Sequence, residues 1–192
     1  MHDTATPAFA VVHAARVRGI VPDDARGELA SDSEFEQLER DGLVKRTARG
    51  LIATPVGLRE HDSTLEAWRG DLGPVGVVAA TYERFLVLNA PLKAVCSAWQ
   101  RSARDEEALF SVAGQLDDYL SRVRPLISRA ARDAPWFATY ASRLSAAAAA
   151  VAAGDGRFVT DPQVDSFHNI WFECHEDYFV TLGRSREDEE AA

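Results

Sequence analysis

The segment from Asp165 to Val180, DSFHNIWFECHEDYFV, holds the densest set of side chains that could do chemistry in this chain. His168 and His175 lie in it beside Asp165, and imidazole and carboxylate groups are ligands that zinc accepts. In a helix, however, seven residues place the two histidines roughly 10 Å apart along the axis. One ion could not reach both without a ligand from another helix. The spacing therefore predicts no metal site.

The same segment has a helical pattern that gathers aromatic and imidazole side chains on one face. The members of this face are His168, Trp171, Phe172, His175, Phe179 and Leu182. Such a face most often packs in a core, where its histidines find hydrogen-bond partners. The alternative is a ligand pocket, because an apolar wall with a few polar groups is typical of small-molecule sites. That pocket would be lined by His168, Trp171, Phe172 and His175 together with Tyr82 and Trp99.

The chain shows no familiar catalytic arrangement. It has no glycine-rich phosphate loop, no Gly-x-Ser-x-Gly, no His-Glu-x-x-His and no spaced set of cysteines. Cys174 beside His175 is not a dyad, because adjacent helical residues point about 100° apart. Glu173, Glu176 and Asp177 are interpreted as solvated helix carboxylates. We therefore expect neither an autonomous enzyme nor a bound cofactor.

A second chemical feature is a short basic segment near residue 45. Lys45, Arg46 and Arg49 fall within five residues. They belong to two short predicted strands, 43–47 and 50–53, which flank a tight turn. Cations on a hairpin of this kind can contact phosphate groups.

Helices are predicted on both sides of this hairpin. Apolar periodicity predicts one over residues 8–18, and Pro22 opens a short one that runs to about Leu29. Ser31 and Glu34 have the spacing of a capping box and start a third helix. After the hairpin, Thr54 and Pro55 begin a fourth. Its expected inward residues are Val56, Leu58, Leu65 and Trp68.

The stretch LERDGLVKRTARGLIATPVGLREHD, residues 38–62, resembles part of the MarR-type regulators. That part is the end of the third helix, the wing and the start of the next helix. In this family it commonly reads Leu-Glu-x-x-Gly-Leu-Val, a basic hairpin and Thr-Pro-x-Gly. The resemblance implies a winged helix-turn-helix domain over residues 7–70 and a transcription regulator that binds double-stranded DNA.

The resemblance also implies where DNA would be contacted, since such domains place the third helix in the major groove. The implied contacts are Lys45, Arg46 and Arg49 in the wing, Ser33 and Gln37 in the third helix, and Arg18. The third helix departs from the pattern, because residues 31–41 hold five carboxylates and a single arginine, Arg40. An alternative is therefore a winged helix that binds protein, as an accessory or regulatory subunit of a larger enzyme complex.

The remainder of the chain is predicted to be entirely helical. Asp71-Leu72-Gly73-Pro74 is the expected boundary, and residues 75–183 are the expected domain for dimerisation and for partner or ligand binding. Pro91 predicts a break or a kink near Asn89, and Asp161-Pro162 is expected to open a last helix over 163–182. Residues 184–192 form a charged tail, expected to be frayed. The predicted fold class is therefore mainly α, with a small hairpin wing in the first domain.

Composition limits the class of protein. Hydrophobic residues make up 46% and charged residues 27% of 192 residues, which is a globular composition. The net charge of −9 is not that of a broadly electrostatic nucleic-acid binder, so local patches must carry any DNA binding. No apolar run approaches the ~20 residues of a membrane helix, and the N-terminus does not read as a signal peptide. Cys96 and Cys174 stand alone in apolar patterns, which indicates buried thiols and a cytoplasmic protein.

Overall fold

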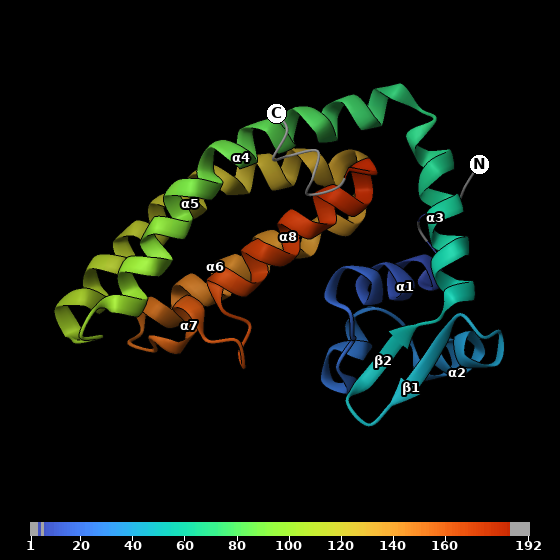
Figure 1. Ribbon diagram of the computed structural model, residues 1–192, viewed down its shortest axis with the longest axis horizontal. Coiled ribbons are helices and arrows are strands. Elements are labelled where there is room, and N and C mark those ends of the chain that lie inside the picture. Colours follow the sequence, from blue (N-terminus) through green and yellow to red (C-terminus); the bar gives the residue numbers. More distant parts are fainter. Residues whose placement is uncertain (1–3, 5, 185–192) are drawn as a thin grey trace. The chain divides into compact units, whose positions relative to one another are not determined.

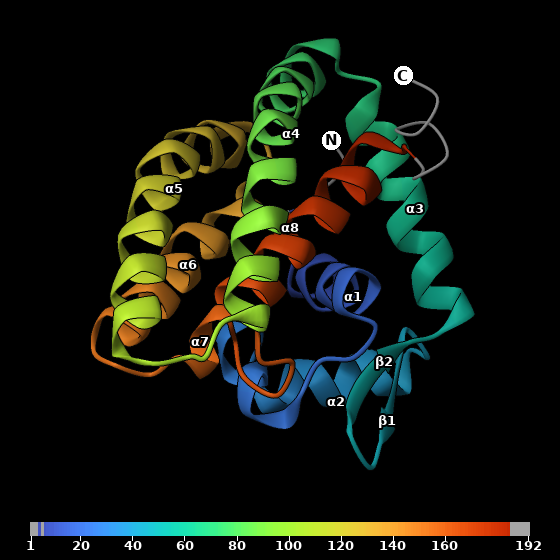
Figure 2. The same cartoon turned by 60° about the vertical axis from the view of Figure 1, so that its left-hand side comes forward.

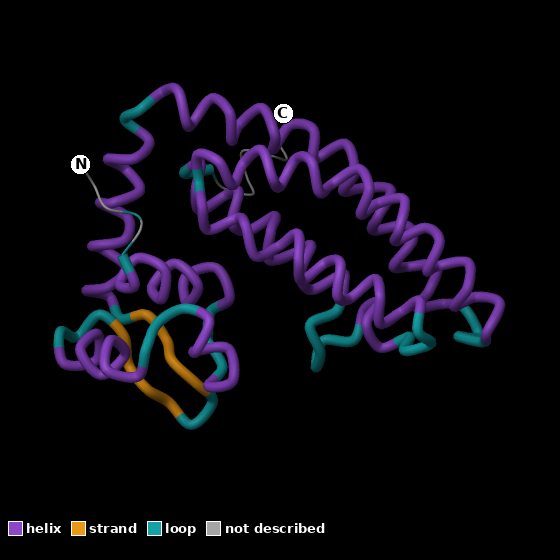
Figure 3. Tube along the Cα trace, turned by 180° about the vertical axis from the view of Figure 1, so that it is seen from behind, coloured by secondary structure: helices purple, strands orange, loops and turns teal. Residues whose placement is uncertain are grey.

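The computed structural model describes residue 4 and residues 6–184, so the predicted charged tail lies outside the described residues except for Arg184. The chain is mainly helical with one two-stranded antiparallel sheet, which confirms the predicted mainly α class. It divides into two compact units, one formed by residues up to Leu72 with Gly183 and the other by Gly73–Leu182. Figure 3 shows the helices in purple and the single hairpin in orange.

In its described residues, the first unit contains three α-helices, one 3-10 helix and the hairpin (Figure 1). In chain order these are α1 (Pro7–Arg18), η1 (Asp23–Glu28), α2 (Asp32–Arg40), β1 (Val44–Thr47), β2 (Gly50–Ala53) and α3 (Pro55–Arg69). The capping box predicted for α2 is confirmed: Ser31 accepts from the Glu34 N–H, and the Glu34 carboxylate accepts from the Ser31 N–H at 2.7 Å. Thr54 likewise caps α3 by accepting from the Gly57 N–H.

The hairpin is fastened to the core of this unit. Val21 pairs with Leu51 through two backbone hydrogen bonds of 2.8 and 2.9 Å, so the edge of β2 is partly covered. Val11, Val12 and Phe35 pack with these two residues in one apolar cluster. Each fully buried side chain of this size contributes about 1.5–3 kcal/mol, so burial fixes the hairpin against α1 and α2.

One expectation for α3 is wrong. Val56, expected to point inward, is 41% exposed, and Gly57, His61 and Leu65 form the buried face instead. The reason is a close approach of backbones: a Cβ at position 57 would collide with the carbonyl of Leu43. Only glycine fits there, so the helix turns its glycine face toward the hairpin.

The second unit is entirely helical in its described residues (Figure 2). Its elements are α4 (Leu72–Arg101), α5 (Glu106–Asp133), η2 (Pro135–Phe137), α6 (Ala138–Ala152), α7 (Arg157–Thr160) and α8 (Phe167–Leu182). Helix α6 packs against both α5 and α8. Aromatic rings join α4 to α8, since Phe85 stacks on Trp171 with ring centroids 4.3 Å apart.

One predicted break and one predicted helix start in this unit are wrong. Helix α4 continues through Pro91, so the chain does not leave the helix near Asn89. Pro91 lies on the exposed face, where water can satisfy the carbonyl group that loses its helical partner. Helix α8 begins at Phe167 rather than at residue 163, because the side-chain amide of Asn169 donates to the carbonyls of Asp161 and Val164 and holds this segment as a loop.

No helix in residues 6–184 combines the length and the apolar character needed to cross a bilayer.

Candidate functional site

The hairpin presents the basic residues on a fixed frame. In its register Val44 faces Ala53, Lys45 faces Ile52 and Arg46 faces Leu51. The turn is closed by Thr47, whose hydroxyl donates to the Gly50 carbonyl at 2.8 Å and accepts from the Arg49 N–H at 3.2 Å. Val44 and Leu51 point into the core, so the alternation of a strand directs Lys45 to the opposite face. Arg46 shares the face of Val44, but it lies next to the turn and its side chain is exposed.

Arg46 is held by carboxylates from two other elements. Its guanidinium donates to Glu39 of α2 at 3.1 Å and lies 3.5 Å from Asp23 of η1. The hydrogen bond with Glu39, followed by the charges of Glu39 and Asp23, raises the pKa of Arg46 above its usual value. Arg46 therefore joins three elements of the first unit, and a phosphate group would have to compete with two carboxylates for it.

Lys45 and Arg49 differ from Arg46 in this respect. Both are exposed, and neither makes an ion pair with any residue that the structure describes. Arg18 belongs to the last turn of α1 and not to the hairpin. The predicted wing cations thus divide into two that are available to a polyanion and one that is engaged within the fold.

The exposed face of α2 is polar and predominantly acidic. Ser33 lies in its first turn, with its hydroxyl 3.2 Å from that of Ser31. Gln37 is engaged on both sides, since its amide donates to Asp41 at 2.8 Å and accepts from Arg40 at 2.9 Å. Arg40 also lies 3.6 Å from Glu36. The two predicted base-contacting residues are therefore exposed but stand among carboxylates.

The six residues proposed for a ligand pocket do not share one environment. Tyr82 and His175 are buried and hydrogen-bonded to each other, with 3.2 Å between the hydroxyl and Nε2. Trp171 is also buried and donates from its indole to Asn89 at 3.2 Å. These three side chains fill the interface of α4 and α8, as the packing interpretation of the segment expects.

The other three members of that set lie elsewhere. Phe172 is 48% exposed, although the pattern placed it with the inward face. His168 is partly buried one turn earlier on α8. Trp99 lines a hollow together with residues of the 154–163 segment, and none of the other five residues lines that hollow.

The interpretation of two carboxylates on α8 as solvated is wrong. Asp177 is only 1% exposed, and it accepts hydrogen bonds from the Tyr140 hydroxyl at 2.8 Å and the Thr181 hydroxyl at 2.9 Å. Glu173 forms a two-pronged ion pair with Arg143 at 2.7 Å. Burial, and then the charge of Asp177, raises the pKa of Tyr140 well above its usual value. The phenol therefore stays protonated and donates.

Neither cysteine has the environment of a reactive thiol. Burial raises the pKa of Cys96 to about 11, and burial together with the charges of Asp177 and Glu173 raises the pKa of Cys174 well above its usual value. Reactive cysteines need a lowered pKa and access to solvent. In the described ranges, no group of three or more histidine, cysteine or acidic side chains is arranged to hold a metal ion.

Sequence reasoning missed a buried histidine pair in the first unit. His13 of α1 and His61 of α3 are hydrogen-bonded, and Phe9 stacks on both rings at about 5 Å. The signal was the position of each histidine on the apolar side of its helix. The partnership itself spans 48 residues, so no local pattern indicates it.

Comparisons with models of known protein families, with curated proteins and with solved structures found no match for this chain.

Proposed function

We propose that this protein is a cytoplasmic transcription regulator whose residues 7–70 act as a winged helix-turn-helix domain on duplex DNA. One observation carries the proposal: a hairpin anchored to the core directly follows α2 and presents Lys45 and Arg49 without ion pairs to any described residue. The order helix, helix, helix, hairpin, helix is that of a winged helix, in which α2 would be the helix that faces the major groove.

In this proposal the wing supplies most of the affinity. Lys45 and Arg49 contact phosphate groups, which fixes position on the duplex and carries no sequence information. Ser33 and Gln37 are the polar side chains of α2 that can reach base edges. The carboxylates around them repel the duplex, so we expect weaker binding and a smaller salt dependence than a basic α2 would give.

The helical unit has a separate part in the proposal. Residues 75–183 would join two copies of the chain about a two-fold axis, so that two wings meet the two halves of a pseudo-palindromic site. A dimer also doubles the number of phosphate contacts, which compensates for the few free cations of one copy.

The test is whether the whole chain binds duplex DNA at low salt. Binding is measured by the fluorescence anisotropy of a labelled, mixed-sequence duplex. The Lys45→Ala, Arg46→Ala, Arg49→Ala variant should lose binding to all sequences and flatten its salt dependence. Arg84→Ala on α4 removes an exposed arginine outside the first unit and serves as the control. Absence of duplex binding, or equal binding by the triple variant, contradicts the proposal.

A second candidate function rests on the engagement of Arg46. A hairpin cation tied to Glu39 and Asp23, beside an α2 face rich in carboxylates, suits a winged helix that binds a basic protein surface. The protein would then be an accessory subunit of a larger enzyme complex. Stoichiometric co-purification of one partner that is lost with Glu36→Lys, together with no retention on DNA, would favour this function over the first.

A further inference from the structure

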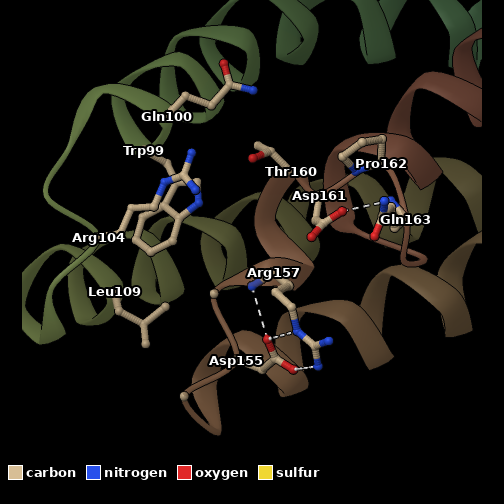
Figure 4. A pocket seen from close by; sticks show the side chains of 12 residues that line it. Trp99, Gln100, Arg104, Leu109, Asp155, Arg157, Thr160, Asp161, Pro162 and Gln163 are labelled. Atoms are coloured by element: carbon tan, nitrogen blue, oxygen red, sulfur yellow. Dashed lines mark hydrogen bonds and ion pairs between the residues drawn. The ribbon is translucent and has the colours of Figure 1, made fainter.

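The second unit contains a hollow that none of the proposed DNA-binding residues lines. It has a volume of about 800 Å³ and lies between the end of α4 with the following turn and the segment from Gly154 to Gln163. Small-molecule sites commonly enclose about 300–1,000 Å³, so its size suits a metabolite. Figure 4 shows Trp99, Gln100 and Arg104 on one side and Thr160, Asp161 and Pro162 on the other.

Both walls of the hollow are held in place by contacts that need no ligand. A Cβ at Gly156 would lie 2.7 Å from the Trp99 ring, so the turn rests with its bare backbone on the indole. On the facing wall, the Asn169 amide holds the carbonyls of Asp161 and Val164, and Arg143 pairs with Asp165 at 2.6 Å. A preformed wall lowers the ordering cost of binding.

Some of the charged side chains that line the hollow form ion pairs and others do not. Arg157 and Asp155 neutralise each other in a pair of 2.7 Å. Arg104 has no ion pair with any residue between 6 and 184, and its backbone adopts φ +56°, a conformation that non-glycine residues rarely hold. Asp161 accepts the backbone N–H of Gln163 at 2.8 Å, and it too has no ion pair within that range.

One cation and one carboxylate therefore remain available on opposite walls, with apolar surface from Trp99, Leu109 and Pro162 beside them. A simple anion would be repelled by Asp161, and a simple cation would be repelled by Arg104. A molecule that carries both charges can form an ion pair with each of these residues, and the lining as a whole is neutral.

We propose that this hollow binds a small zwitterion with an apolar body, the chemistry of a free amino acid. Its carboxylate pairs with the Arg104 guanidinium, which suits a planar two-oxygen acceptor. Its ammonium group pairs with Asp161, and its apolar part lies against Trp99 and Leu109. This inference goes beyond the proposed DNA binding and does not depend on it.

The test compares three probes on the whole chain by nuclear magnetic resonance, with the Trp99 indole N–H as reporter. L-Phenylalanine has both charges, 3-phenylpropionate lacks the ammonium group and phenethylamine lacks the carboxylate. At up to about 10 mM, we expect saturable shifts and the tightest binding for L-phenylalanine.

Two variants separate the charges. Arg104→Gln should weaken the binding of L-phenylalanine and of 3-phenylpropionate by about tenfold, since a charge-assisted pair is lost. The affinity for phenethylamine should not change. Asp161→Asn keeps an acceptor for the Gln163 N–H and should weaken L-phenylalanine and phenethylamine instead. Arg84→Gln is the control, because Arg84 lies about 25 Å along α4 from the end of the helix that lines the hollow.

The proposal is overturned if L-phenylalanine binds no better than 3-phenylpropionate, if no probe shifts the Trp99 signal, or if Arg104→Gln and Arg84→Gln behave alike. No DNA is present in the experiment, so a negative result would contradict only the ligand site. The proposed DNA binding is tested by the duplex experiment alone.

Discussion

His13 and His61 are joined by a buried hydrogen bond of 2.9 Å between Nδ1 of the first ring and Nε2 of the second. The other nitrogen of His61 lies 3.3 Å from the Asp62 carboxylate. A neutral His61 with its proton on Nδ1 satisfies both contacts, because Nε2 then accepts the His13 N–H. A protonated His61 would direct an N–H at Nδ1 of His13, so His13 would have to carry its proton on the other ring nitrogen to accept it.

This geometry predicts that the protein loses stability in mild acid. Burial and the neighbouring His13 lower the pKa of His61 to about 4, with Arg16 adding to the effect and Asp62 opposing it. An unfolded histidine titrates near ~6.5, so the unfolded chain binds the extra proton first as the pH falls. The contribution is complete above pH ~6.5 and is lost between there and about 4, by at most about 3 kcal/mol.

Urea unfolding of the whole chain at several pH values measures this loss. His61→Gln keeps an acceptor for His13 and removes the titration, so its stability should change less over the same interval. His168→Gln removes a partly buried histidine of α8 and should follow the wild type. A His61→Gln variant as acid-sensitive as the wild type would contradict the assignment.

A second prediction concerns the carboxylate that engages the wing. Replacing Glu39 by Gln removes the strongest partner of Arg46, and the guanidinium becomes available to phosphate. If the chain binds duplex DNA as proposed, affinity at low salt should rise by about two- to fivefold, the effect of one added phosphate contact in an exposed setting. Fluorescence anisotropy with the duplex described above measures the change.

Glu36→Gln is the matched control for that experiment. It removes the same charge from the same helix, but its partner is Arg40 and not a wing residue. Equal gains in the two variants would mean that only the overall charge of α2 matters, and that Arg46 is not released by the loss of Glu39.

A third prediction contrasts two glycines in helices. Gly57→Ala should destabilise the first unit by more than about 2 kcal/mol, because the new Cβ would collide with the Leu43 backbone and separate α3 from the hairpin. Gly114→Ala on α5 meets no atom within 4 Å and should stabilise its helix by about 0.5–1 kcal/mol.

Thermal unfolding followed by circular dichroism compares the two variants with the wild type. Opposite signs are the expected result. A Gly57→Ala variant as stable as the wild type would show that α3 can move away from Leu43 without loss.

The sequence alone determined the elements whose signals are local. The capping pair of Ser31 and Glu34 and the Thr54-Pro55 start of α3 lie where the sequence places them, because each motif satisfies backbone groups within four residues. The basic hairpin could be predicted for the same reason, because two short strands around a tight turn are a local signal.

Tertiary structure decided which side chains meet, and therefore what each polar group does. The sequence predicted Arg46 to be a free cation of the wing, but the fold places Asp23 of η1 and Glu39 of α2 within ion-pair distance of it. Asp177 looked solvated until α6 placed Tyr140 against it. Periodicity in the sequence indicates which side chains share a face of a helix, but not which segment packs against that face. A carboxylate can be buried wherever a hydrogen-bond donor offsets the free energy of removing it from water, and that donor can come from a distant segment.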